Sequence, residues 1–490
     1  MLTRLARPWP LFLLAVAVAL YRWWAWSQLD GLSLFSDEAQ YWLWAQAPDW
    51  GYYSKPPMVA WLIWLSTHTL GSDAEWAIKA VPLLLYPFAT FGVYALGRRL
   101  YDAETGRDAA LLFLLMPALS LSAMLVTSDV PLLLFWTASL WFLWAALEGN
   151  AWRDWLLLGL CAGLGLMSKY SMAFFAFAAL AFVLTHRQEY RLLLNPRLYA
   201  AATLALLVFL PNLLWNLRHD FVTVQHHAQI SELDGPLIHP GAFFEFLGAQ
   251  FGVFGPVSFG LLLLALARTP MWRKTPRPTR FLLAFCGAPL LLILGLAFLS
   301  HAEANWGAPL YVAASVLVAA HFRQQRRWLR AALLVNLLLA LLLYHYIALL
   351  QATGLPLQRQ YDAYRRLRGW DEVGYQVQRV MQEYGDTRLL TDERNLSAWL
   401  LYYARPLNQP RTWAPPGLPP QNHYQQTLPL QADDAGAFLW ITKPPANTEV
   451  LVRFRQFERL PDIVVEPYPG LQRHYEAWRV EGFKGYDPGH

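Results

Sequence analysis

The chain has 490 residues, of which 56% are hydrophobic and only 15% are charged, and its mean hydropathy is +0.25. Soluble globular proteins carry roughly 25% charged residues, so this composition excludes a soluble protein and indicates a membrane protein with many spans. The formal net charge of +5 does not indicate a nucleic-acid partner, because the basic residues are divided among short loops between apolar segments. The two cysteines lie in apolar runs, so no disulfide is expected.

Apolar runs of about 20 residues predict transmembrane helices. The first run follows Arg4 and Arg7 and lacks the small-residue cleavage site of a signal peptide, so we expect it to be retained as a span. Eleven spans are predicted, centred near Ala17, Phe88, Met116, Leu140, Leu160, Phe177, Leu206, Val257, Leu291, Val316 and Leu339. The sequence GVFGPVS predicts a break within the eighth of them.

The stretch SDEAQYWLWAQAPDWGYYSKPPMVAW, residues 36–61, follows the first apolar run and combines carboxylates, a lysine and many aromatic residues. Its aromatic part is too short and too interrupted to cross a membrane. We therefore expect residues 27–76 to form the first outer loop, with one or two short helices that lie along the membrane interface and include Trp42 and Trp44.

Basic residues in short loops predict the direction of the spans, because such loops favour the cytoplasmic side. Eighteen Lys and Arg residues fall on one side and five on the other. Most of the eighteen lie in the connections 97–108, 186–197, 267–280 and 323–330. The N-terminus is therefore predicted to be cytoplasmic and, with an odd number of spans, the C-terminus is predicted to lie outside.

The last part of the chain, residues 351–490, is polar and rich in proline. It has a helical pattern in residues 361–385 and strand-like runs at TRLLTDE, AFLWITK and YEAWRVEGF. This length suffices for a small domain. The predicted fold class is an all-α polytopic membrane protein, with the membrane domain over residues 1–350 and a small extracytoplasmic α/β domain over residues 351–490.

The predicted outer loops contain both acids and cations. Asp37 and Lys55 lie in the first outer loop, and Asp129 and Lys169 lie at the outer ends of later spans. Charges at such positions are costly when they face hydrocarbon, so we expect them to face a shared cavity. Purely structural interpretations also exist: either lysine could snorkel to the interface, and Asp129 before Val-Pro could cap a helix.

These residue types are typical of a transfer reaction with a phosphate leaving group. The outer side of a membrane has no ATP, so a synthetic reaction there needs an activated substrate, such as a sugar linked to polyprenyl phosphate. Lys55 and Lys169 would stabilise the charge that grows on the leaving phosphate. Asp37 would accept the proton of the attacking hydroxyl or orient it, whereas the side chain of the adjacent Glu38 is expected to diverge.

The motifs DEAQYW, GYYSKPPMVAW, TSDVP and SKY resemble those of the GT-C membrane glycosyltransferases. The most similar groups are the protein O-mannosyltransferases and the bacterial lipid A aminoarabinose transferases, and the resemblance covers about the first 320 residues. It implies an inverting enzyme of the bacterial inner membrane, with a periplasmic C-terminal domain, that uses a polyprenyl-phosphate sugar. By the same resemblance Asp37 matches the catalytic acid residue, Lys55 and Lys169 match phosphate contacts, and Asp129 matches the second functional carboxylate.

The resemblance leaves the substrates open. Gln40 and Ser54 stand where the aminoarabinose branch has an arginine and a carboxylate, which argues against an aminoarabinose donor. The acceptor is expected to be lipid A, lipopolysaccharide, another envelope glycolipid or a protein. Further candidate substrate-binding residues are Glu38, Tyr41, Tyr53, Arg218, His226, His301, Glu303 and Asn305.

A divalent metal ion is a candidate cofactor, with ligands from two outer loops: His226, His227, His301 and Glu303. Adjacent histidines rarely both bind one metal ion, and no helical His-x-x-x-His spacing is present, so the sequence favours polar loop positions or acceptor contacts for these residues.

A polytopic transporter or lipid flippase is the alternative from another functional class. Transporters place ionisable residues near the middle of the membrane on broken helices, often in repeated halves. The centres of the apolar runs are nearly free of charge here, and no repeat is visible. The sequence therefore favours a glycosyltransferase whose partners are membrane lipids, a polyprenyl-phosphate sugar and a lipid or protein acceptor.

Overall fold

A computed structural model describes residues 8–230, 238–269, 275–385, 387–415 and 417–486. The chain divides into two compact units. Unit 1 comprises the chain up to Gln28, Lys55–Leu62 and Trp76–Tyr346. Unit 2 comprises Leu29–Ser54, Ile63–Glu75 and the chain from Ile347 onward. The predicted first outer loop therefore belongs mostly to the same unit as the C-terminal part of the chain.

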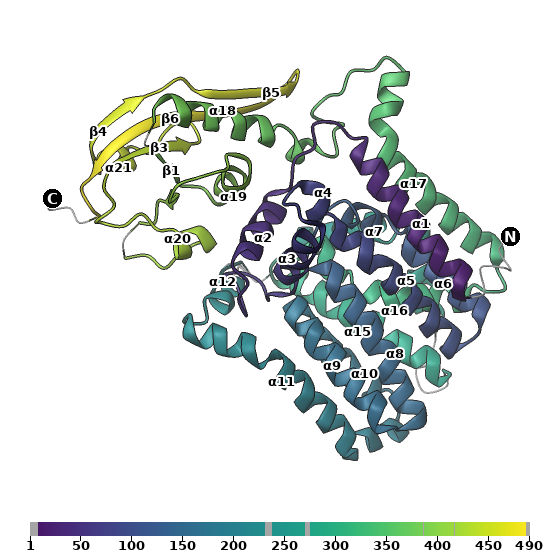
Figure 1. Ribbon diagram of the computed structural model, residues 1–490. Coiled ribbons are helices and arrows are strands. Elements are labelled where there is room, and N and C mark those ends of the chain that lie inside the picture. The colour runs from purple at the N-terminus through teal and green to yellow at the C-terminus, as the bar shows by residue number, and fades with distance from the viewer. Residues whose placement is uncertain (1–7, 231–237, 270–274, 386, 416, 487–490) are drawn as a thin grey trace. The chain divides into compact units, whose positions relative to one another are not determined.

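Unit 1 is helical (Figure 1). Its helices are α1 (Pro8–Ser27), α5 (Ala80–Leu100), α6 (Ala103–Leu115), α7 (Pro117–Ser122), α8 (Asp129–Gly149), α9 (Trp152–Ser168), α10 (Ala173–Leu184), α11 (Pro196–Arg218), α12 (Val222–Ile230), α13 (Pro240–Val253), α14 (Pro256–Arg268), α15 (Arg277–Leu299), α16 (Leu310–His321) and all but the end of α17 (Arg326–Ala352). Unit 1 also contains the 3-10 helices η2 (Tyr170–Met172), η3 (Arg187–Leu194) and η5 (Ala304–Gly307).

Among the described residues, six helices are long and apolar enough to cross a membrane, or seven if the bent pair α13 and α14 is one span. The predicted number of eleven is therefore not confirmed. The segment predicted around Met116 is interrupted between α6 and α7, where Pro117 cannot donate a backbone hydrogen bond. The segments around Leu160, Phe177 and Val316 form helices of only 17, 12 and 12 residues.

The predicted break in GVFGPVS is confirmed. Helices α13 and α14 meet at an angle of 116°, and Gly255 between them has a φ of +98°, which favours glycine. A Cβ at this position would overlap the side-chain amide of Asn336 on α17. That amide donates to the carbonyl of Phe254 and to the hydroxyl of Ser258, at 3.2 Å each, so Asn336 stabilises the bend.

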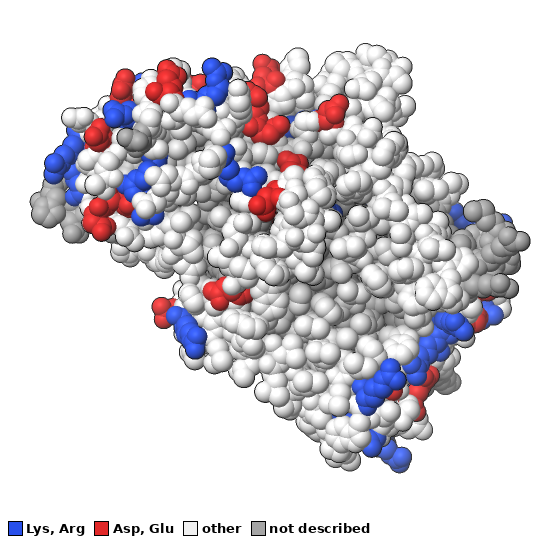
Figure 2. All heavy atoms as spheres, viewed as in Figure 1, with Lys and Arg blue, Asp and Glu red and all other residues white. Residues whose placement is uncertain are grey.

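The four basic connections are joined to one another at one end of unit 1. Arg326 forms ion pairs with Asp108 and Glu104, at 2.5 Å each, and Arg277 pairs with Glu189 at 2.8 Å. The hydroxyls of Tyr101 and Thr279, 2.9 Å apart, join these two pairs of connections to each other. Figure 2 shows that the helical surface on this face carries little charge, with Lys and Arg gathered along one border.

Unit 2 contains a six-stranded sheet. Its strands are β1 (Arg388–Thr391), β2 (Arg411–Thr412), β3 (Ala437–Thr442), β4 (Phe454–Arg459), β5 (Ile463–Tyr468) and β6 (Leu471–Phe483). The order is β2-β1-β3-β6-β4, and β5 pairs with β6. Strand β1 is parallel to β2 and β3, whereas β6 is antiparallel to β3, β4 and β5. The runs TRLLTDE, AFLWITK and YEAWRVEGF contain β1, β3 and part of β6, as predicted.

The helices of unit 2 are α2 (Ser36–Gln46), the later part of α3 (Met58–Leu70), α18 (Trp370–Glu383), α19 (Arg394–Tyr403), α20 (His423–Thr427) and α21 (Thr448–Leu451). Helix α4 (Glu75–Ile78) begins at Glu75, the last residue of the segment Ile63–Glu75, and continues into unit 1. Helix α18 covers the second half of the helical pattern predicted for residues 361–385. It begins after Gly369, whose φ of +82° ends the preceding turn.

Helix α2 packs against α19 inside unit 2. The indole N–H of Trp42 donates to Asp73 at 3.0 Å, and Trp44 stacks on Tyr52 with ring centroids 4.5 Å apart. Trp42 and Trp44 are only 5% and 1% exposed. The rings of these two tryptophans therefore fill a protein core and do not face lipid, whereas the placement of the loop along the membrane interface stays a prediction.

Candidate functional site

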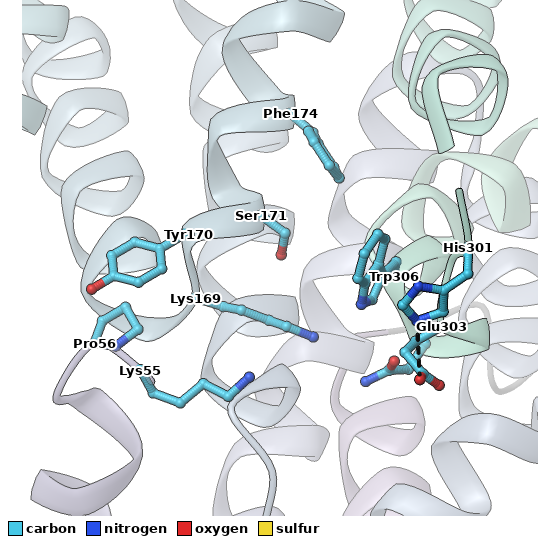
Figure 3. A pocket seen from close by; sticks show the side chains of 10 residues that line it. Lys55, Pro56, Lys169, Tyr170, Ser171, Phe174, His301, Glu303 and Trp306 are labelled. Atoms are coloured by element: carbon cyan, nitrogen blue, oxygen red, sulfur yellow. Dashed lines mark ion pairs between the residues drawn. The ribbon is translucent and has the colours of Figure 1, made fainter. Parts of the chain in front are cut away.

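A cavity of about 730 Å³ lies in unit 1 and brings together residues from three separate segments. Its lining consists of Lys55, Pro56, Lys169, Tyr170, Ser171, Phe174, His301, Glu303, Asn305 and Trp306. In Figure 3, Lys55 and Lys169 extend from one wall with their amino groups directed toward the wall that carries His301 and Trp306. Five residues predicted from the outer loops thus line one cavity.

The position of Lys169 follows from the end of α9. This helix stops at Ser168, and Lys169 has an extended backbone before η2 begins. Its amino group donates to both carboxylate oxygens of Asp129, at 2.8 and 3.0 Å. Asn305 donates to the same carboxylate at 3.1 Å. Asp129 is the first residue of α8, where the helix dipole also stabilises its negative charge.

Lys55 is held by the prolines that follow it. Pro56 and Pro57 restrict the backbone of the residue before each of them to extended conformations, and α3 begins directly afterwards at Met58. Lys55 is half-buried at the cavity wall. A short, stiff connection of this kind fixes the position of the lysine backbone.

The rest of the cavity wall is aromatic and polar. Tyr170 donates to the side chain of Asn212 at 3.1 Å and accepts from Asn216 at 3.4 Å, so α11 fixes its ring. His301 and Glu303 lie 3.6 Å apart, and Trp306 lies in η5. The sequence prediction did not name Tyr170 or Trp306 as site residues, although Tyr170 belongs to the SKY motif and Trp306 directly follows Asn305.

The predicted metal site gains no support from the residues that the structure describes. No three His, Cys, Asp or Glu side chains within those ranges are placed to hold a metal ion together. His301 faces Glu303, whereas His226 lies on α12 and does not line the cavity. The side chain of His227 lies outside the described part of the chain.

Asp37 belongs to unit 2, where its partner is Arg394, the first residue of α19. The guanidinium of Arg394 donates to Asp37 at 2.5 Å and to the side chain of Gln40 at 3.0 Å. Burial opposes the charge of Arg394, but the Asp37 carboxylate outweighs it, so the pKa of Arg394 is raised above its ordinary value. No sequence signal pointed to Arg394, because 357 residues separate it from Asp37.

The neighbouring candidates in unit 2 have structural contacts. The buried Glu38 carboxylate accepts the backbone N–H of Phe35 at 2.9 Å, so Glu38 caps α2 and diverges from Asp37, as expected. Tyr41 is buried beside Trp44, and Tyr53 donates to the carbonyl of Pro420 at 2.9 Å. In unit 1, Arg218 is exposed at the end of α11 and does not line the cavity.

Comparison with known proteins identifies the family. The family described as dolichyl-phosphate-mannose-protein mannosyltransferase matches residues 54–215. The lipid A galacturonosyltransferase RgtD of Rhizobium johnstonii is 32% identical over 418 residues, which cover 84% of this chain and 86% of that protein. The chain belongs to the GT-C family of membrane glycosyltransferases. The resemblance read from the motifs is therefore confirmed, and this GT-C protein is an enzyme rather than a transporter or flippase.

Solved structures show the same fold. The ArnT of Cupriavidus metallidurans bound to undecaprenyl phosphate matches with a TM-score of 0.63 and 15% identity, over 95% of this chain and 97% of that one. The Archaeoglobus fulgidus oligosaccharyltransferase matches with a TM-score of 0.51 and 14% identity, over 81% and 64% of the two chains. The GT-C fold of this multi-span membrane protein is thus shown independently of its sequence motifs.

Proposed function

We propose that this enzyme transfers a sugar from a polyprenyl-phosphate donor to lipid A or a related envelope glycolipid, with inversion at the sugar. The similarity to RgtD, a lipid A galacturonosyltransferase, extends over most of the chain and supports a lipid acceptor. The family whose name specifies a protein acceptor matches only residues 54–215. The fold of ArnT, solved with undecaprenyl phosphate, supports the lipid part of the donor.

The reaction is placed on the outer face of the bacterial inner membrane. Ion pairs join the basic connections of unit 1 at one end, and such loops favour the cytoplasmic side. The N-terminus is then cytoplasmic, and the C-terminal part of the chain is periplasmic. A sugar linked to polyprenyl phosphate is itself activated and is held in the membrane by its lipid tail, so the reaction on this face needs no soluble activated sugar.

The donor phosphate is assigned to the unit 1 cavity, and the two lysines in its wall are the observation that carries this proposal. Lys55 and Lys169 would contact the phosphate, and Asp129 would position Lys169. Tyr170 and Trp306 would supply flat apolar faces for the sugar ring. Because charge grows on the phosphate as the glycosidic bond breaks, the contacts of the two lysines with the phosphate become stronger in the transition state.

Asp37 is the proposed base. The acceptor oxygen forms a bond to the anomeric carbon while the bond from that carbon to the phosphate oxygen breaks. The acceptor proton passes to the Asp37 carboxylate, and polyprenyl phosphate leaves with the electron pair of the broken bond. A single displacement of this kind inverts the anomeric centre. Arg394 would orient the Asp37 carboxylate through the contact at 2.5 Å.

The test separates binding from turnover. Lys55→Ala and Asp37→Asn would be compared with the wild type in lipid nanodiscs, with undecaprenyl phosphate as the binding probe and sugar transfer to lipid A as the activity. Loss of an ionic hydrogen bond should weaken binding to Lys55→Ala about ten- to a hundredfold. Asp37→Asn should bind normally and transfer about a hundredfold more slowly.

Arg379→Ala is the matched control, because Arg379 is an exposed residue of α18 that does not line the unit 1 cavity. Its binding and transfer should equal those of the wild type. Unchanged undecaprenyl phosphate binding in Lys55→Ala would contradict the phosphate assignment, and full activity of Asp37→Asn would contradict the assignment of the base.

A further inference from the structure

A second cavity, of about 520 Å³, lies entirely within unit 2. The first residues of three helices line it: Ser36 of α2, Trp370 of α18 and Arg394 of α19. The first backbone N–H groups of a helix have no partner within the helix, and the helix dipole is positive at this end. At α18 the N–H groups of Trp370 and Asp371 already donate to the hydroxyl of Ser33, so this end contributes only through its dipole. Together the three positive helix ends favour an anion in the cavity.

The side chains around this cavity carry a surplus of positive charge. Its charged lining residues are Asp37, Arg366, Glu393, Arg394, Lys443 and Arg473. Two of the cations already have acidic partners: Arg394 contacts Asp37 at 2.5 Å, and Lys443 contacts Glu393 at 3.1 Å. Within the ranges that the structure describes, no ion pair includes Arg366 or Arg473.

Arg473 is held in a fixed position. Its guanidinium donates to the backbone carbonyls of Arg365 at 2.5 Å and Arg368 at 3.2 Å, and it lies over the ring of Trp370, 4.4 Å from the centroid. Trp370 in turn stacks on Trp399, with centroids 3.3 Å apart. Burial lowers the pKa of Arg473, so its charge is partly removed from water and would gain from an anionic partner.

We propose that this cavity binds a phosphate monoester on the saccharide headgroup of the acceptor glycolipid. The inference rests on the proposed function, in which Asp37, a lining residue of this cavity, acts on the acceptor. The surplus of two positive charges matches a phosphate monoester, which carries about −1.5 to −2 charges at neutral pH, better than a carboxylate with one. Arg366 and Arg473 bind the phosphate oxygens.

The experiment measures acceptor binding without any donor, using the full chain in nanodiscs. The probes are lipid A that carries its phosphates and the same lipid A after treatment with a phosphatase. The wild type should bind the phosphorylated form about tenfold more tightly or better. Arg366→Gln should lose most of this difference, and because Arg366 is exposed this variant should fold normally. Arg379→Gln is the matched control and should keep the full difference.

Two further measurements make the outcome specific. Arg473→Lys retains a charge but cannot keep both carbonyl contacts and the stacking, so it should lose part of the discrimination. Undecaprenyl phosphate should bind equally to the wild type and to Arg366→Gln, because the donor phosphate is assigned to the unit 1 cavity. Weaker undecaprenyl phosphate binding in Arg366→Gln would overturn the proposal, because the cavity would then serve the donor.

Equal binding of the two lipid A forms to the wild type, or equal behaviour of Arg366→Gln and Arg379→Gln, would also overturn it. This failure is distinct from a failure of the proposed function. If the phosphate-binding proposal fails, sugar transfer continues without discrimination between the two forms of lipid A. If the proposed function fails, the binding difference persists but no sugar is transferred.

Discussion

Lys169 contacts both carboxylate oxygens of Asp129, although the two residues are 40 positions apart in the sequence. Their side chains are only 12% and 8% exposed. Breaking a pair of this kind by removing one partner leaves a charge with little access to water, which is costly. The pair therefore fixes the direction of the lysine at the cavity wall, and removal of either residue should affect the other.

Asp129→Asn should lower kcat/KM at least tenfold, because Lys169 loses the charge that positions it. The double variant Asp129→Asn, Lys169→Ala should be little worse than Lys169→Ala alone, which corresponds to a coupling of about 1–3 kcal/mol. Steady-state kinetics of the two single variants and the double variant would measure this coupling. Strictly additive losses would show that the two residues act independently.

Arg394→Gln should lower kcat with little change in the KM for the donor. Arg394 touches the Asp37 carboxylate and Gln40 and is therefore a positioning residue for the base. Arg394→Lys should recover only part of kcat, since an ammonium group lacks the planar fork that reaches both partners. Kinetics at varied donor concentration test this, with Arg379→Gln as the control. An increase in KM at constant kcat would refute the positioning role.

Unit 2 should lose stability between about pH 6.5 and pH 4. Burial, with a smaller contribution from Arg394, lowers the pKa of His423 to about 4, and its ring contacts those of Trp44 and Tyr424. The unfolded chain binds this proton near pH 6.5 and the folded chain only near pH 4, so acid favours unfolding. The loss is about 3 kcal/mol over this range.

Thermal unfolding of the full chain in detergent at several pH values would measure this effect. His423→Gln should be less stable at neutral pH but should show a flatter dependence between pH 6.5 and pH 4. The same slope in the variant and the wild type would assign the acid sensitivity to other groups.

Gly255→Ala should destabilise unit 1 by about 1–3 kcal/mol, because an added Cβ meets Asn336 and the backbone has a positive φ. Gly252→Ala is the matched control, since a Cβ at Gly252 on α13 meets no atom within 4 Å. The control should be neutral or slightly stabilising. Unfolding temperatures in one detergent would compare the two variants, and similar values would argue against a rigid bend.

A reporter enzyme fused after Gly369 should be active only outside the cytoplasm. A reporter in the connection between α16 and α17, where Arg326 binds Asp108, should show cytoplasmic activity. Alkaline phosphatase and green fluorescent protein fusions in bacteria would report the two sides. The opposite pattern would reverse the orientation assigned from the basic residues.

Local patterns in the sequence predicted the structural features that are determined by residues close together in the chain. Strands β1, β3 and β6 follow from apolar runs, and the bend at Gly255 follows from a glycine beside a proline. Lys55 and Lys169 were predicted to face one cavity because charges avoid hydrocarbon, and they line the same cavity.

The parts that sequence reasoning missed depend on distant contacts. Trp42 and Trp44 have the composition of membrane-interface residues, yet α19 and Tyr52 cover them. Several apolar runs form helices that are shorter than a span or broken at a proline, which average hydropathy does not register. Arg394 lies in a polar segment with no motif, so only folding reveals its contact with Asp37.

The contact between Asp37 and Arg394 also sets an order of events during synthesis. The ribosome makes Asp37 within the first tenth of the chain and Arg394 only after about four-fifths of it. Within the ranges that the structure describes, every long apolar helix except the first lies between the two in sequence. The carboxylate therefore acquires its guanidinium partner only after the membrane helices have been made, and a chain interrupted before residue 394 contains the acid without the residue that orients it.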